Sequence, residues 1–295
     1  MKLRLLIFST IISFLFCDIS ARSIDAKRGV VADGYNFWLY EPDSVNTESP
    51  KPLVIFLHGA SLCGNDLNRV RRYGTIDAIE RGRDIDAYVI APQNPGGSWN
   101  PHKVMNIVDW VMDNGQVDST RIYVIGMSLG GYGSIDVAAA YPDRIAAAMA
   151  FCGGGTSSNM SRLNEVPLWI VHGTADRAVS VKESDKVVDA MRLSDPSTPR
   201  LIYDRIPGMN HSQPARFFYM PESYEWLFAH SLTDEGRPCV EGFDIRSGAK
   251  SAYLGLTHNP SKSKSIKSAK KKRGSYTKRH HRKSKKRSRS ARVRR

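Results

Sequence analysis

Short apolar runs alternate along the chain with segments in which apolar residues recur at helical spacing. Continuous short apolar runs are typical of strands that are covered on both faces of a sheet. Together with the aromatic-rich stretch 35–40, such runs predict strands at 52–57, 87–92, 121–125, 144–151, 167–171 and 201–203. The helical spacing predicts helices at 104–112, 182–193 and 217–229, and another that follows Ser128. This alternation predicts an α/β fold in which a mostly parallel sheet carries helices on both faces.

The N-terminal segment departs from this pattern. Lys2 and Arg4 precede a short apolar run at 5–16, which predicts a signal peptide over residues 1–23. The run is too short to span a bilayer comfortably, so we expect a chain that does not cross the membrane. We therefore expect a secreted, periplasmic or cell-envelope protein. Lipid attachment at Cys17 is the alternative, although bulky residues precede that cysteine where a lipoprotein signal has small ones.

The C-terminal segment differs from the rest of the chain in charge. Residues 260–295 hold 18 Lys or Arg and no acidic residue, whereas the other residues hold 25 basic and 29 acidic groups, a net charge of −4. This Lys/Arg/Ser-rich composition predicts a disordered basic tail. Between the signal peptide and the tail we expect a main domain at 24–232 and an irregular connector at 233–259.

The basic tail suggests an anionic partner. Nucleic acid is not expected, because an exported protein rarely meets it and Tyr276 is the only aromatic residue in the tail that could stack on bases. Anionic envelope polymers or lipid head groups are our hypothesis for the partner. A disordered terminus without a partner is the alternative.

Three cysteines remain after the signal peptide, namely Cys63, Cys152 and Cys239. Three cysteines do not form a disulfide framework, and no metal-ligand spacing such as C-x-x-C is present. A bridge between Cys63 and Cys152 is possible, since both follow predicted strands at the same sheet edge. Isolated buried thiols are the alternative.

The most informative stretch is a sharp strand-to-helix turn around Ser128. The sequence Gly126-Met127-Ser128-Leu129-Gly130 follows a predicted buried strand and precedes a predicted helix. Small residues two before and two after the serine are what such a crowded turn requires. The turn would place the hydroxyl of Ser128 above the sheet edge, at a helix N-terminus that favours developing negative charge. Ser128 is therefore a candidate nucleophile.

A serine nucleophile needs a base and a carboxylate that orients the base. Asp176 directly follows the strand predicted at 167–171, and His211 lies in a glycine-containing loop after the strand predicted at 201–203. The carboxyl ends of parallel strands meet at one edge of the sheet, so the three side chains can converge. A surface turn role for Asp176 and a structural loop role for His211 are the alternatives. We predict a Ser128, Asp176, His211 triad.

An oxyanion hole needs two backbone N–H groups aimed at the carbonyl oxygen as it gains charge. Leu129, directly after the nucleophile, can supply one of them, and Ala60 or Ser61, in the loop after the strand predicted at 52–57, can supply the other. Other histidines suit catalysis less well. We expect His58 to brace the oxyanion loop, and His172 and His230 to serve local structure.

From about Asn36 to Ala229 the chain resembles the α/β-hydrolase superfamily. Within it, the chain is similar to small secreted esterases and peptidases of the dienelactone-hydrolase, feruloyl-esterase and prolyl-oligopeptidase-like group. The resemblance is carried by LHGASLCGND (57–66), APQNPGGSW (91–99), GMSLGGYG (126–133), HGTAD (172–176) and GMNHS (208–212). It implies acyl transfer at Ser128 without metal or cofactor. At Ser61 relatives often have a second glycine. The resemblance also implies that Trp99 lies near the acyl pocket, with ordinary loop packing as the alternative.

The short segment 152–167, where many lipases carry a lid, leaves no room for a lid domain. An open site favours a modest acyl group on a bulky carrier, such as a polysaccharide ester. A secreted carboxylesterase is thus our first hypothesis. A serine peptidase acting on short peptides is the second, because the triad alone does not separate esters from amides. A non-catalytic envelope-binding protein, active through its tail, is the third.

Overall fold

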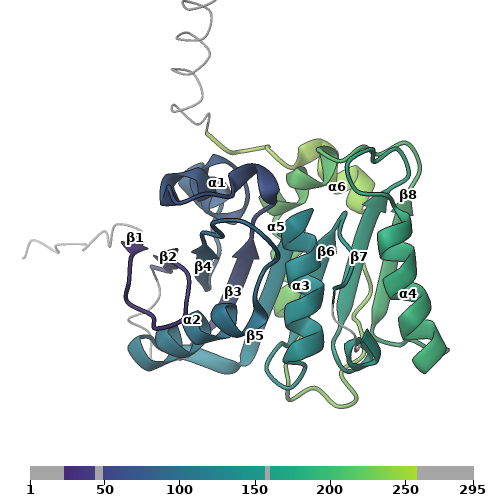
Figure 1. Ribbon diagram of the computed structural model, residues 1–295, viewed down its shortest axis with the longest axis horizontal. Helices are drawn as coiled ribbons and strands as arrows, with labels where there is room; N and C mark the ends of the chain where they lie inside the picture. Colours follow the sequence, from purple (N-terminus) through teal and green to yellow (C-terminus); the bar gives the residue numbers. More distant parts are fainter. Residues whose placement is uncertain (1–22, 44–48, 157–159, 258–295) are drawn as a thin grey trace, which may run out of the picture.

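The apolar runs of the sequence form the strands of one eight-stranded sheet in the computed structural model, which describes residues 23–43, 49–156 and 160–257 (Figure 1). The strands lie in the order β1-β2-β4-β3-β5-β6-β7-β8. Their bounds are β1 Ser23–Lys27, β2 Phe37–Glu41, β3 Lys51–Leu57, β4 Tyr88–Pro92, β5 Val117–Met127, β6 Ala147–Phe151, β7 Leu168–Gly173 and β8 Leu201–Ile206. All pairs from β4 to β8 are parallel, and only the edge pairs β1–β2 and β2–β4 are antiparallel. The predicted mostly parallel sheet is confirmed.

Helices cover both faces of this sheet. One face packs against the buried sides of α2 (Pro101–Asn114), α3 (Leu129–Ala140) and α4 (Lys182–Ser194), which lie in front of the sheet in Figure 1. The other face packs against α1 (Thr75–Glu80), α5 (Pro221–Phe228) and α6 (Ile245–Ser251). Four short 3₁₀ segments join these elements: η1 (Ala60–Leu62), η2 (Leu67–Arg72), η3 (Met160–Glu165) and η4 (Gln213–Tyr219).

The central strand β3 shows why its sequence is continuously apolar. Successive side chains of a strand point to opposite faces. Accordingly Leu53 and Ile55 join the core under α2 and α3, whereas Val54 and Phe56 join the core under α1 and α5. All four side chains are fully buried. A strand that is covered on both faces has no position left for a polar residue.

Several elements differ from the predictions. The edge strand β1 and the short helix α1 were not predicted, because neither has a long apolar run or a repeated helical spacing. The helix predicted at 217–229 begins later, as α5, since Pro221 cannot donate to a preceding helical turn and instead begins a new helix. The predicted connector 233–259 is not irregular throughout. It contains α6, whose Ile245 is buried in the core.

Other predictions concern residues outside the described ranges. The signal peptide (apart from its last residue, Ser23), lipid attachment at Cys17 and the basic tail all fall there. Within the described ranges, no helix is both long and apolar enough to cross a bilayer. The Cys63–Cys152 bridge is not formed, because both residues are free thiols, as is Cys239. Between β6 and β7 the described residues contain η3 and no lid domain.

Three buried histidines serve as fixed hydrogen-bonding groups. In His58 the Nδ1–H donates to the Gly59 carbonyl at 2.9 Å, while Nε2 accepts from the Asn94 N–H at 3.1 Å. His230 is held in the same way, donating to Trp226 O and accepting from Val240 N–H. These arrangements require the neutral ring, because a protonated Nε2 cannot accept. Burial lowers the pKa of His58 to about 4, and burial also lowers the pKa of His230 and of His172.

The crossing of β3, β5 and α3 depends on two glycines without room for a side chain. A Cβ at Gly126 would lie 2.2 Å from the Gly130 carbonyl oxygen, and one at Gly130 would lie 1.8 Å from the Leu57 carbonyl oxygen. Both contacts are to backbone atoms, which cannot move aside as a flexible side chain can. The glycines therefore let α3 approach the sheet closely enough to form the Ser128 turn.

We predict that Gly130→Ala lowers the free energy of unfolding by about 2 kcal/mol or more, because the added methyl group overpacks a backbone contact. Denaturant titration followed by circular dichroism measures this loss. Ala140→Ser, at an exposed position at the end of the same helix, is the control and should stay within about 0.5 kcal/mol of the wild type. A Gly130→Ala protein as stable as that control would contradict the packing argument.

We also predict that stability falls as the pH drops from about 6.5 toward about 4. The unfolded chain protonates its histidines near pH 6.5, whereas folded His58 resists protonation until about pH 4, so unfolding takes up protons in this window. The loss from His58 alone is on the order of 3 kcal/mol. Urea titrations at pH 7 and pH 4.5 measure the total loss, and His58→Gln should reduce it. An equal loss in His58→Gln would contradict this assignment.

Candidate active site

The backbone conformation of Ser128 places its hydroxyl at the edge of the sheet. The residue links the end of β5 to the start of α3 and has φ +59° and ψ −122°. A non-glycine residue rarely adopts a positive φ, and such strain is held only where the surroundings fix the backbone. Here the Ser128 N–H donates to Phe151 O at 2.8 Å. The glycines on either side of Ser128 leave room for β5 and α3 to pack closely. The turn has the geometry of a nucleophile elbow.

His211 lies between the other two predicted residues. Its Nε2 is 3.0 Å from Ser128 Oγ, and its Nδ1 is 2.7 Å from Asp176 Oδ2. An acceptor carboxylate on one side requires Nδ1 to carry the proton, which leaves Nε2 free to accept the serine hydroxyl proton. Residues far apart in sequence thus form one hydrogen-bonded row. This is the geometry in which histidine can act as a base toward serine.

Asp176 lies in the turn after β7, and its side chain is completely buried. Its Oδ1 accepts from the Ala178 N–H at 2.8 Å and from the Val179 N–H at 2.9 Å. Burial raises the pKa of this carboxyl. The hydrogen bonds from Val179, His211 and Ala178 outweigh that effect, and the net result is a pKa below the usual range. The carboxyl is therefore ionised at neutral pH and can stabilise a charged His211.

Two loops bring backbone N–H groups to the same edge. Leu129 is the first residue of α3, while Ala60 and Ser61 are the first two of η1. The first N–H groups of a helix have no intrahelical partner and point outward along the axis. These are the residues that the sequence predicted for an oxyanion hole, and their helix positions are compatible with that role.

Tyr73 was missed by the sequence reasoning. Its hydroxyl accepts from the Gly59 N–H at 2.9 Å. A Cβ placed on Gly59 would lie 2.9 Å from this hydroxyl and 3.3 Å from Ser128 Cβ, so the phenol lies close to the serine. Tyr73 therefore fixes the backbone at the start of the η1 loop. Tyr73 lies beyond the LHGASLCGND motif (57–66), and a single tyrosine there gives no sequence signal for this role.

Trp99 is buried beside the same loop. Its indole Nε1–H donates to His58 O at 3.3 Å, and its ring meets His58 and Tyr35 edge-on at centroid distances of 5.0 and 5.3 Å. Only 3% of its surface is exposed. These contacts match the packing alternative, in which Trp99 supports the oxyanion loop through His58.

Cys152 lies beneath the triad, and its donor atom and those of Asp176 and His211 lie within 4.8 Å of one another. Two features argue against a metal ion there. The Asp176 carboxylate and the His211 ring already bond each other, and burial raises the pKa of the Cys152 thiol far above neutrality. A thiol binds metals well only as the thiolate. Among the described residues no other group of three such ligands was found.

Comparison with known proteins gives a consistent picture. The Phospholipase/Carboxylesterase family matches residues 96–224. Acetylxylan esterase A of Emericella nidulans is 29% identical over 100 residues, which cover 34% of this chain and 32% of that protein. Acetylxylan esterase A of Aspergillus ficuum is 26% identical over 191 residues, which cover 56% of this chain and 60% of that protein. The chain thus spans about a third of the length of the first relative and less than two thirds of the second.

A solved structure of a thermostable esterase has a similar fold. It superposes with a TM-score of 0.58 at 28% identity, covering 66% of this chain and 59% of that one. The predicted α/β-hydrolase resemblance is therefore confirmed by sequence and by structure. The sheet order, the strained turn at Ser128 and these relatives agree: the chain has an α/β-hydrolase fold and is a hydrolase similar to the carboxylesterases.

Proposed function

We propose that the protein is a serine esterase that removes small acyl groups, such as acetyl, from a polysaccharide. The observation that carries the proposal is the hydrogen-bonded row from Ser128 through His211 to the buried carboxylate of Asp176. The named activity of the acetylxylan esterase relatives supports acetyl as the acyl group and a polysaccharide as its carrier. The absence of a lid domain from the described residues between β6 and β7 fits a bulky carrier.

The reaction follows from the geometry. His211 Nε2 takes the proton of Ser128 Oγ as the oxygen attacks the acyl carbonyl, and the ionised Asp176 stabilises the charged ring. The N–H groups of Leu129 and of Ala60 or Ser61 hold the oxyanion. As the bond from the acyl carbon to the sugar oxygen breaks, His211 protonates that oxygen, so the sugar departs as a free hydroxyl and the acyl group stays on Ser128. A water molecule, activated by His211, attacks this acyl-enzyme and frees the serine.

Location and the tail complete the proposal. The charged and apolar pattern at 2–16 supports export, and the secreted or envelope location would bring the enzyme to its polysaccharide. The 18 basic residues of 260–295 support binding of the tail to anionic envelope polymers.

We predict that Ser128→Ala lowers kcat for aryl acetates by about 10⁴-fold or more, because no other group on the row can form the acyl-enzyme. Steady-state assays with acetyl and feruloyl esters beside peptide amides measure this loss and the substrate preference. Labelling by a serine-directed phosphonate should disappear in the same variant. Turnover of amides alone would contradict the esterase proposal and favour the peptidase alternative. No labelling of the wild type would contradict both.

We predict that Tyr73→Phe lowers kcat about 10-fold to 100-fold, because the buried Gly59 N–H loses its acceptor and the oxyanion loop loses its anchor. KM should change little, since the phenol holds the loop and not the ground-state substrate. Tyr253→Phe, at an exposed tyrosine whose ring packs against Tyr219, is the matched control. Equal kcat in both variants would contradict the role of Tyr73.

A further inference from the structure

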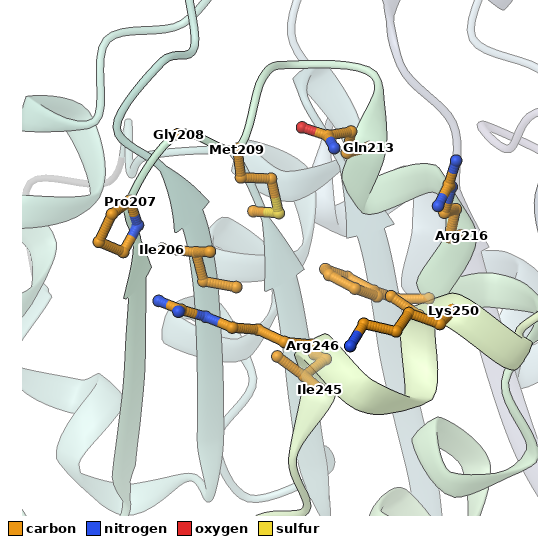
Figure 2. A pocket seen from close by; sticks show the side chains of 11 residues that line it. Ile206, Pro207, Gly208, Met209, Gln213, Arg216, Ile245, Arg246 and Lys250 are labelled. Atoms are coloured by element: carbon orange, nitrogen blue, oxygen red, sulfur yellow. The ribbon is translucent and has the colours of Figure 1, made fainter.

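A cavity of about 320 Å³ lies beside the loop that carries His211 (Figure 2). It is lined by the end of β8 and the loop after it, by η4 and by α6. Its volume is at the lower end of the range for small-molecule sites. The lining residues are Ile206, Pro207, Gly208, Met209, Gln213, Arg216, Phe217, Ile245, Arg246, Ala249 and Lys250.

The charged groups of this lining are all positive. Arg246 and Lys250 reach toward the cavity from α6, and Arg216 comes from η4 (Figure 2). Among the residues that the structure describes, none of those lining the cavity is acidic. Arg246 and Lys250 are four residues apart, so their like charges lie on one face of α6 and weakly destabilise the helix. The remainder of the chain before the tail has a net charge of −4, so this cluster runs against the overall charge of the domain.

The acid closest in sequence is already occupied. Asp244 precedes α6, and its carboxylate accepts from the N–H groups of Arg246 and Ser247 and from the Ser247 hydroxyl. It therefore caps the helix and is not among the residues that line the cavity. Within the described ranges, none of the ion pairs that the structure contains involves Arg216, Arg246 or Lys250. The Lys250 charge acts on Asp244 without an ion pair, and the three positive groups around the cavity can therefore still bind an anion.

The floor of the cavity is apolar. Ile206, Met209, Phe217 and Ile245 each expose less than a tenth of their surface, and they form a base beneath the charged groups. A surface of this kind packs against the C–H face of a sugar ring, while an arginine fork binds a carboxylate through two hydrogen bonds. A uronate, which is a sugar ring with one carboxylate, has both features.

The cavity also adjoins the catalytic loop directly. Gln213 Oε1 accepts from the Asn210 N–H at 2.7 Å, so a lining residue holds the backbone next to His211. Met209 O accepts from the Ala175 N–H at 3.1 Å, so the same strip of chain also supports the Asp176 turn. An occupant of this cavity would therefore lie beside the loop that carries His211.

We propose that this cavity is a subsite for a uronate unit of an acidic polysaccharide whose neighbouring sugar carries the ester. The reaction part of this inference rests on the proposed function, whereas the binding part does not. Arg246 and Lys250 hold the carboxylate, Arg216 adds to the positive field, and the apolar floor takes the ring. The subsite gives the enzyme a preference for acidic over neutral acylated glycans.

The test compares two acetylated xylo-oligosaccharides that differ only in one glucuronate branch, using the full chain. We expect wild-type kcat/KM to be about tenfold or more higher for the acidic substrate, mainly through KM. Arg246→Gln combined with Lys250→Gln should abolish this preference and leave turnover of the neutral substrate unchanged. The matched control, Lys182→Gln with Arg192→Gln on α4, makes the same charge change at exposed positions and should keep the preference. The tail is identical in all of these proteins.

Three outcomes of the hydrolysis assay overturn the subsite: a wild type without preference, a cavity pair that keeps the preference, or a control pair that loses it as fully as the cavity pair. A wild type that hydrolyses neither substrate refutes the proposed function, and the subsite is then judged by binding alone. Calorimetry with the deacetylated glucuronate-bearing oligosaccharide should show binding by the wild type and the control pair but not by the cavity pair. No difference among the three proteins in this measurement also overturns the subsite.

Discussion

The structure depends most on the strained backbone of Ser128. A positive φ at a non-glycine residue is unfavourable by itself, and it persists here because β5, β6 and α3 fix the backbone on both sides. Gly126 and Gly130 permit that fixation, since any side chain there would strike backbone atoms. The unfavourable backbone conformation of Ser128 is offset by the packing of two apolar cores, one on each face of the sheet. The result is a hydroxyl held in one place above the sheet edge.

The other site residues are held to this fixed point by contacts between loops. A Cβ on Gly173 would lie 2.0 Å from Met209 O, so the loop that carries Asp176 and the loop that carries His211 pack backbone to backbone. On the opposite side, His58, Trp99 and Tyr73 form a buried polar and aromatic support under the η1 loop. Because these contacts lie within the protein, the hydrogen-bonded row of Ser128, His211 and Asp176 is pre-organised before any substrate binds. The positive cavity beside Met209 then lies next to the same loop and not at a remote surface.

The sequence predicted the fold well, because buried parallel strands leave long apolar runs and helices leave a regular spacing. It also predicted which residues would form the row, since Ser128, Asp176 and His211 each lie in the turn or loop that follows a strand. It missed β1, whose sequence is largely polar and not fully buried, α1, which is too short to repeat a helical spacing, and α6, whose burial depends on partners distant in sequence such as Met220. Tyr73 and the positive cavity were missed for the same reason. Their significance comes from tertiary neighbours, and no local spacing records those neighbours.

The central claim is that Ser128 carries the acyl group during turnover. Rapid acid quench of the wild type with excess aryl acetate, followed by mass spectrometry of the digested protein, measures this directly. Our account predicts that the peptide containing Ser128 gains the mass of one acetyl group within the first turnover, and that His211→Ala forms this adduct far more slowly. An acetyl adduct on another residue, or ester turnover without any adduct on Ser128 under conditions where deacylation is slow, would contradict it.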